Sequence, residues 1–341
     1  MARGLASGFD WGGASGRGAF AAALAAVAIP LLWLWLGPAR VEGWSRWHEA
    51  AGVVPLALLT VPALGMAVRR LHDAGRAGGW AWLLALPWLR WALVLALLLL
   101  PSGARPRITE GPGRLLGLGL GIAVALGVLL SLVFATAWVS DRAMAPALRA
   151  GDLLLLWRAP LTPRRGDVLL VRLPGEAAPR PLRVVGLPGE RVAVAGGLPV
   201  IGGVPARQER AGFLTEPFRP EGAARAMPLC GNGAVGLGAG CTTRLLRETL
   251  PDGTAQTILD VGPGPLDDRP EVAVPPGHLF LLGDARDGAR DSRLSPNVGG
   301  AGLVPLDAVE GRALLVLWSA AGASPWDPRG WRPSRLLGGV P

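Results

Sequence analysis

The pattern of apolar runs changes near residue 140, and this change most constrains how the chain can fold. Before it, four runs approach the about 20 residues that a helix needs to cross a bilayer, and they lack the polar face of a helix buried in a soluble protein. These runs cover residues 18–36, 50–68, 80–100 and 115–138. We therefore predict a multi-span α-helical membrane domain over 8–103, followed by a loop and a transmembrane anchor over 104–138.

The arginines predict how this membrane domain is oriented. Segments 69–76 and 105–114 are both rich in arginine, which keeps a loop in the cytoplasm. Run 80–100 separates them and carries Pro87 and Arg90 near its middle. Because an arginine is costly in the middle of a bilayer, we predict that this run is re-entrant or lies in the interface. The other three runs then place everything after 138 outside the cytoplasm.

From residue 140 onward the apolar runs are short and end at Gly, Pro and Asp, as in strands joined by tight turns. These runs are 153–157, 168–173, 182–185, 191–194, 278–282 and 313–318. The predicted fold class is therefore multi-domain, with the helical membrane domain followed by a mostly antiparallel β domain over 139–319. The tail, 320–341, is rich in Pro, Gly, Arg and Trp, and we expect it to be disordered or to rest on the lipid surface.

Composition excludes several kinds of function. The 34 basic residues are all arginine, so no lysine can form a Schiff base or act as a base. Three scattered histidines and two cysteines do not suggest a metal site, and we expect no cofactor. Since the arginines flank apolar runs, we expect membrane lipids as partners and no nucleic acid. Cys230 and Cys241 are expected to form a disulfide on an oxidising face, with two inert thiols as the alternative.

One stretch in the membrane domain resembles a known family. VPALGMAVRRLHDAGRAGGW (61–80), with the earlier GRGAF, is similar to a bacterial inner-membrane domain of unknown function, family 805. The resemblance covers about residues 8–103 and implies no activity. His72, between Arg70 and Asp73, is either functional or part of a structural cluster at the interface.

Four later blocks resemble, in order, the boxes of bacterial type I signal peptidases. They are SDRAMAPALRAGD (140–152), RRGDVLLV (164–171), PLRVVGLPGERV (181–192) and LLGDARDGARDSR (281–293). The resemblance covers about 115–341. It implies a protease anchored in the bacterial cytoplasmic membrane, with a β-rich domain on the periplasmic or outer face, that cuts signal peptides after small residues. The arginine placement predicts the same side.

This resemblance also implies catalytic groups that the chain lacks. The family uses a serine hydroxyl as nucleophile and a buried lysine as base, and those positions hold Ala143 and Leu182. The two supporting hydroxyl positions hold Asp141 and Ala289, and a carboxylate at Asp141 would repel the developing oxyanion. Arg183 cannot serve as the base because it stays protonated. We therefore predict a protein that is inactive by the Ser/Lys mechanism, a pseudoprotease.

Residues that would hold the family's fold are retained, by contrast. They are Gly151, Asp152, Gly166, Asp167, Arg183, Gly186, Gly189, Gly283, Asp284, Asp291, Ser292 and Arg293. We predict a cleft between 141–148 and the strand at 181–185, where an extended peptide adds as a strand. Its predicted contacts are Asp141, Met144, Pro146, Leu148, Pro181, Leu182 and Val184. Precursors that carry signal peptides, or the secretion machinery, are the expected partners.

Two other hypotheses remain open. The chain is an active signal peptidase if a displaced nucleophile such as Ser140 works with His278, although their spacing does not bring them together. Alternatively, the membrane domain carries the function and the β domain is a scaffold. The neighbouring carboxylates Asp284, Asp287 and Asp291 suit turn stabilisation better than acid–base catalysis.

Overall fold

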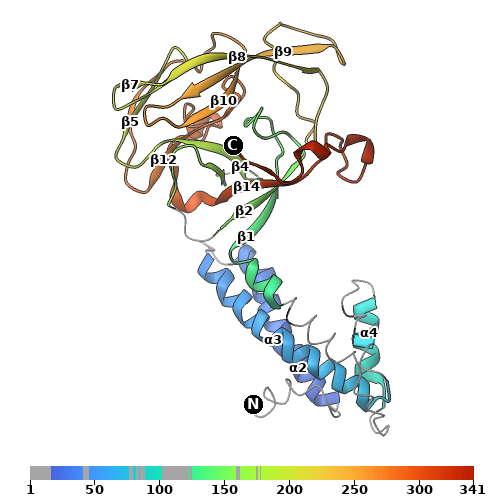
Figure 1. Ribbon diagram of the computed structural model, residues 1–341. Helices are drawn as coiled ribbons and strands as arrows, with labels where there is room; N and C mark the ends of the chain where they lie inside the picture. The colour runs from blue at the N-terminus through green and yellow to red at the C-terminus, as the bar shows by residue number, and fades with distance from the viewer. Residues whose placement is uncertain are drawn as a thin grey trace. The chain divides into compact units, whose positions relative to one another are not determined.

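The computed structural model divides the chain into two compact units, Met1–Val133 and Phe134–Pro341 (Figure 1). The residues that it describes are 17–40, 46–76, 80–81, 84, 89–101, 122, 125–158, 162–173, 176 and 178–341.

The first unit is helical. Its helices are α2 (Arg17–Arg40), α3 (Arg46–Asp73) and α4 (Leu89–Leu99). Two stretches, Arg17–Leu34 and Ala51–Asp73, are long and apolar enough to cross a membrane. They correspond to the first two predicted runs. Helix α4 has 11 residues, so it is about 16 Å long and covers about half of a bilayer's hydrocarbon core. Pro87 and the segment 105–114 lie outside the described residues.

Two arginines close the carboxyl end of α4. Arg70 is fully buried and donates from Nε to the Leu97 carbonyl at 2.8 Å. It also bonds to the Leu100 carbonyl and, at 2.5 Å, to the Asp73 carboxylate. Arg17 donates to Leu100 at 2.9 Å. Since the last carbonyls of a helix have no partner within the helix, these bonds account for Arg70 and Asp73 structurally. They leave open whether His72 has a function.

The predicted anchor is wrong at its carboxyl end. Residues 125–130 are helical, but a turn follows at 131–133 and strand β1 covers Phe134–Trp138. The ring of Phe134 stacks edge-on against Trp157, with 5.3 Å between centroids. An apolar run looks alike in a helix and in a buried strand, and here pairing with the next strand decides the outcome.

The second unit is built on one eight-stranded antiparallel sheet. Its order is β1-β2-β14-β3-β4-β12-β13, and β15 also pairs with β14. Beyond β1, its strands are β2 (Asp152–Trp157), β3 (Val168–Val171), β4 (Arg180–Gly186), β12 (His278–Leu282), β13 (Val304–Pro305), β14 (Val309–Ser319) and β15 (Gly338–Gly339). The predicted fold class is confirmed: a helical unit with two candidate membrane spans is followed by a mostly antiparallel β domain.

Two smaller antiparallel sheets complete the unit (Figure 1). One joins β8 (Arg207–Pro217), β9 (Gly240–Thr249) and β10 (Ala255–Asp260), and the other joins β5 (Arg191–Ala195), β6 (Leu198–Ile201), β7 (Val204–Pro205) and β11 (Arg269–Ala273). Sequence analysis did not anticipate β8 and β9. Most β8 side chains are exposed, so that strand has no regular apolar alternation to reveal it.

The main sheet is covered on both faces. Because neighbouring strand residues point to opposite faces, Leu169 of β3 packs in one core together with Leu182. Leu170 packs in the other core, together with Met144 and Leu148. Positions 144 and 182 therefore belong to different cores.

Repeated Gly-Asp turns shape the ends of the strands. Gly151 and Gly166 both have φ of +87°, which favours glycine. In each turn the following aspartate accepts the backbone N–H three residues before it, at 2.8 Å for Asp152 and 2.9 Å for Asp167. Gly189 shares the same φ, and Gly186 has Val192 Cγ2 2.6 Å from where a Cβ would stand. Gly151, Gly166 and Gly189 are therefore needed for the backbone conformation of turns, and Gly186 for the close approach of a neighbouring side chain.

The tail is ordered, and the expectation that it is disordered is wrong. Its β15 extends the main sheet, and the Trp331 ring stacks edge-on against Trp318 at 4.8 Å. Arg335 donates to the buried carboxylate of Asp152 at 2.6 Å. A polar composition does not reveal that a tail arginine satisfies a carboxylate nearly two hundred residues earlier. Trp326 remains exposed, so contact with lipid stays a prediction.

Candidate functional site

The loop between β1 and β2 presents position 143. Met144 and Leu148 are fully buried, and the Leu148 N–H donates to the Met144 carbonyl at 2.8 Å. At the base of the loop, Gly151 N–H donates to the Val139 carbonyl at 2.9 Å. The apolar side chains anchor the loop from beneath, so the backbone around Ala143 is held in one position.

The β4–β12 register brings position 182 to the same place. Arg183 pairs with Leu282, so the next step of this antiparallel register brings Leu182 alongside Gly283. Leu182 is fully buried, in the core that it shares with Leu169. Its isobutyl group can neither accept nor donate a proton.

Gly283 lies in contact with both Ala143 and Ala289. A Cβ at Gly283 would collide with Ala289 Cβ and stand 2.7 Å from the Ala143 carbonyl oxygen. That same oxygen accepts the Ala285 N–H at 2.9 Å. Positions 143, 182 and 289, far apart in sequence, therefore converge around one glycine, and each carries an apolar side chain.

The Asp141 side chain is hydrogen-bonded to the backbone N–H of Ala143. Its Oδ1 accepts the Ala143 N–H at 3.1 Å, and its Oδ2 lies 3.6 Å from Arg180 Nε. Burial raises the pKa of Asp141, while the Ala143 N–H and Arg180 lower it less. The Ala143 N–H is thus already bonded to a carboxylate.

Arg180 is a residue of the site that sequence analysis missed. It lies on β4 two residues before Leu182, and residues two apart share a face of a strand. Its side chain is 11% exposed, and it donates from Nη1 to the Arg290 carbonyl at 2.8 Å and also bonds to Glu176. The i, i+2 spacing from position 182 was the one available signal.

Asp141, Ala143 and Arg180 line a cleft of about 550 Å³. The small residues Ala143, Ala145, Ala226, Ala285 and Gly288 line part of it, and the larger apolar residues are Met227, Leu229 and Leu259. The charged residues are Asp141, Arg142, Arg180, Asp287 and Arg290. Arg142 is already paired with Glu221 at 2.5 Å and with Glu216.

A disulfide fastens one wall of this cleft. Cys230 and Cys241 are bonded, with an S–S distance of 2.10 Å, which confirms the predicted disulfide. Leu229, next to Cys230, is held by Thr243, whose Oγ1 donates to its carbonyl at 2.8 Å. The Leu229 side chain also reaches Gly288, where a Cβ would stand 2.8 Å from Leu229 Cδ1.

Arg183 is held by a buried ion pair. It donates to both carboxylate oxygens of Asp284, at 2.8 and 2.6 Å, and to the Gly166 carbonyl at 2.9 Å. Burial raises the pKa of Asp284, and Arg183 lowers it by less. Since Arg183 lies next to Leu182 on β4, it faces the opposite side of the strand from position 182. It therefore does not stand where the missing base would be.

The last block is held by its own side chains. Asp291 accepts the Gly283 N–H at 3.1 Å and Arg293 Nε at 2.9 Å. The Ser292 hydroxyl accepts the Leu281 N–H at 2.8 Å. These residues keep Gly283 in place beside the converging alanines.

Most of the predicted peptide contacts are buried in this structure. Met144, Leu148, Pro181, Leu182 and Val184 are core residues, which corrects their assignment to the cleft surface. Strand β4 is paired with β3 over Arg180–Arg183 and with β12 over Arg183–Gly186, so both of its edges are paired at Arg183, and along 180–182 the edge toward β3 is the one paired with a strand. The hydrophobic residues of 181–185 indicated a strand at this place. Only the order of the strands shows that β4 lies within the sheet, between β3 and β12.

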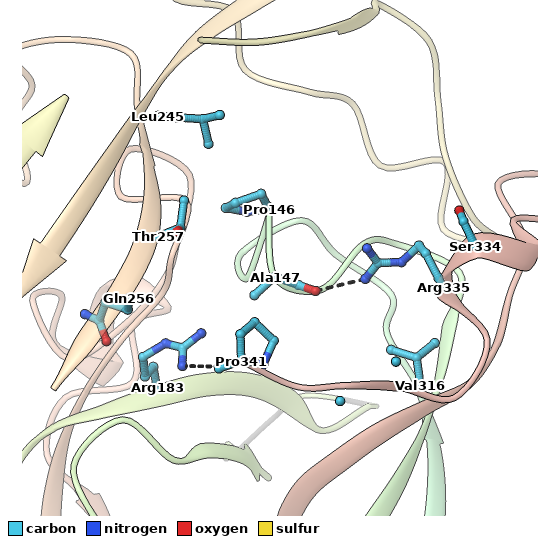
Figure 2. Close-up of a pocket in the computed structure, with 12 residues that line it drawn as sticks. Pro146, Ala147, Arg183, Leu245, Gln256, Thr257, Val316, Ser334, Arg335 and Pro341 are labelled. Carbon is cyan, nitrogen blue, oxygen red and sulfur yellow. Dashed lines mark hydrogen bonds between the residues drawn. The ribbon is translucent and has the colours of Figure 1, made fainter. Parts of the chain in front are cut away.

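Pro146 lines a separate cavity of about 500 Å³ (Figure 2). Ala147 and Arg183 also line it, and the Arg183 Nη1 group donates to the Pro341 carbonyl at 2.6 Å. Figure 2 shows the tail residues Arg335 and Pro341 around this space, with Arg335 bonded to the Ala147 carbonyl at 2.8 Å. The tail therefore covers the loop on its other side.

Ser140 and His278 occupy different parts of the unit. His278 begins β12, where it pairs with Pro305, five residues and about 16 Å along the strand from Gly283. Its Nδ1 lies 3.2 Å from the Pro276 carbonyl. Among the described residues, no contact joins His278 to Ser140, and no group of three or more His, Cys, Asp or Glu side chains is placed to hold a metal.

Comparisons with known proteins agree with both resemblances. A family model described as signal peptidase, peptidase S26, matches residues 114–318. A second, described as a protein of unknown function of family 805, matches residues 9–107. Among solved structures, a signal peptidase I from Enterococcus faecalis is 23% identical, with a TM-score of 0.23, covering 45% of this chain and 97% of its own. No curated protein matches this chain.

Proposed function

Since the chain belongs to the signal peptidase family, peptidase S26, we propose that it is a member without protease activity that binds extended peptides in the cleft at Ala143. In this proposal it resides in the bacterial cytoplasmic membrane as a multi-pass protein. Its β unit then faces the periplasm or the outside, where precursors emerge and where a disulfide is stable.

One observation carries the loss of activity: positions 143, 182 and 289 converge around Gly283 with only apolar side chains. Peptide cleavage by this family's chemistry needs an oxygen nucleophile and a neutral amine to take its proton. The Ala143 methyl and the Leu182 isobutyl group supply neither. The bound carboxylate of Asp141 adds a second obstacle, because negative charge disfavours an oxyanion beside it.

Peptide binding is supported by what the cleft retains. The cleft has a volume of about 550 Å³, within the range of ligand pockets, and alanine and glycine form part of its lining. Its wall at Leu229 is fastened by the disulfide at the neighbouring Cys230. A β domain that acts only as a scaffold does not require an open cleft with a wall fixed by a disulfide.

The test compares wild-type protein in detergent with the double variant Ala143→Ser, Leu182→Lys on a precursor with an Ala-x-Ala site. We expect wild type to leave the precursor intact and to ignore a serine-directed covalent inhibitor. We expect crosslinking from a photoreactive residue at Met227 to capture the precursor. The matched control places the same photoreactive residue at exposed Phe213 on β8, outside the cleft residues.

Cleavage by wild type would refute the pseudoprotease proposal, and its loss in Ser140→Ala would identify a displaced nucleophile. Equal capture of the precursor from positions 227 and 213 would refute peptide binding in the cleft.

A further inference from the structure

Asp141 is bound in the cleft as a ligand would be. Two groups from different segments converge on its carboxylate: the Ala143 N–H donates to Oδ1 at 3.1 Å, and Arg180 Nε lies 3.6 Å from Oδ2 as an ion pair. A backbone N–H and a guanidinium together suit a carboxylate.

Arg180 is held in place by the surrounding structure, whereas Asp141 is more exposed. The Asp141 side chain is 37% exposed, whereas that of Arg180 is 11% exposed. Arg180 has two other partners, the Arg290 carbonyl at 2.8 Å and Glu176, so it stays in place when Asp141 turns outward. Rotation of one partly exposed side chain therefore frees the Ala143 N–H and the guanidinium of Arg180 together.

The charges around this pair favour an anion once Asp141 has turned away. Arg290 is exposed and lines the same cleft, so it adds a second guanidinium. Asp287 also lines the cleft and its charge opposes an anion there, although the Val261 N–H, at 2.8 Å from its Oδ2, holds it in place. Glu176 is already bonded to Arg180.

We propose that the cleft recognises peptides through a free terminal carboxylate, which takes the place of Asp141 on the Ala143 N–H and Arg180. This inference rests on the proposed peptide binding and names its ligand class. Cutting a precursor after a small residue leaves that residue with a free carboxylate, so cleaved signal peptides are the preferred ligands and intact precursors bind more weakly. Small cleft residues such as Ala145 and Gly288 leave room for such an end.

The test measures fluorescence anisotropy with the full-length protein in detergent. The probes are a labelled decapeptide that ends in Ala-x-Ala as the free acid, the same peptide as its amide, and a longer peptide that continues past the site. We expect the acid to bind about tenfold more tightly than either of the others. Arg180→Gln should abolish that preference, and Asp141→Asn should strengthen it because a competing charge is gone.

Arg191→Gln is the matched control, since Arg191 lies on β5 with its side chain 66% exposed and is not among the cleft residues. It should leave the ratio of acid to amide affinity unchanged. Equal binding of acid and amide would overturn this inference and leave the proposed function standing. A preference that survives Arg180→Gln would also overturn it. If none of the three peptides binds, both this inference and the proposed peptide binding are refuted.

Discussion

Replacing Asp284 with asparagine is expected to destabilise the second unit by about 3 kcal/mol, because it leaves the Arg183 guanidinium buried without a counter-charge. Arg183 donates to both oxygens of Asp284, at 2.8 and 2.6 Å, and both side chains are almost completely buried. Breaking a buried pair from one side costs about 3–5 kcal/mol. We expect the lower end since the asparagine oxygen retains one of the two bonds. In a unit of this size that is a fall in Tm of roughly 6–12 °C.

We do not expect the pair itself to be a net source of stability, because burying two charges removes their hydration. Burial raises the pKa of Asp284, and the nearby Arg183 lowers it by less. The double replacement Arg183→Met, Asp284→Leu should therefore destabilise the unit less than Asp284→Asn alone. That ordering separates an unpaired charge from simple loss of packing.

Pulse proteolysis across a urea series measures this, with the fragment that contains the second unit followed on a gel. Glu271→Gln is the control, since Glu271 pairs with Arg191 where their side chains are 40% and 66% exposed. It should change stability by less than about 1 kcal/mol. Equal shifts of the urea midpoint in Asp284→Asn and Glu271→Gln would refute the reasoning.

Three further outcomes are expected. Leu182→Lys alone should destabilise the unit by about 2–5 kcal/mol, since it places an amine in a fully buried position; an unchanged Tm would show that the core opens there. Removal of the disulfide in Cys230→Ser, Cys241→Ser should lower stability by about 3 kcal/mol, because a cross-link over a separation of 11 residues restricts the unfolded chain; urea unfolding of oxidised wild type and variant, both without reductant, measures this, and equal midpoints would contradict it. Burial, with Asp260 and Asp267 nearby, raises the pKa of Asp287 above its usual 3.8. Its ionisation therefore lowers stability as the pH rises through the shifted pKa, and Asp287→Asn should melt higher than wild type at pH 7, with the gap closing toward about pH 4; a gap independent of pH would contradict this.

Linear patterns in the chain determined much of this account. The apolar runs located the helical unit, and the short runs bounded by turn residues located most strands of the main sheet. The four blocks predicted that positions 143, 182 and 289 have lost the family's catalytic groups. The predictions of the fold succeeded because hydrophobicity and turn residues are properties of neighbouring residues.

The tertiary structure alone decided the rest. The break of the fourth run at Phe134, the burial of Met144 and Val184, and the ordered tail depend on which segments pair across the sheet. The contact between Asp141 and Arg180 depends on the same sheet, which brings a loop and β4 together across 39 positions of sequence. The chain itself shows which side chains are charged or apolar, but their partners are set by the packing of distant strands, and those partners determine what the cleft can hold.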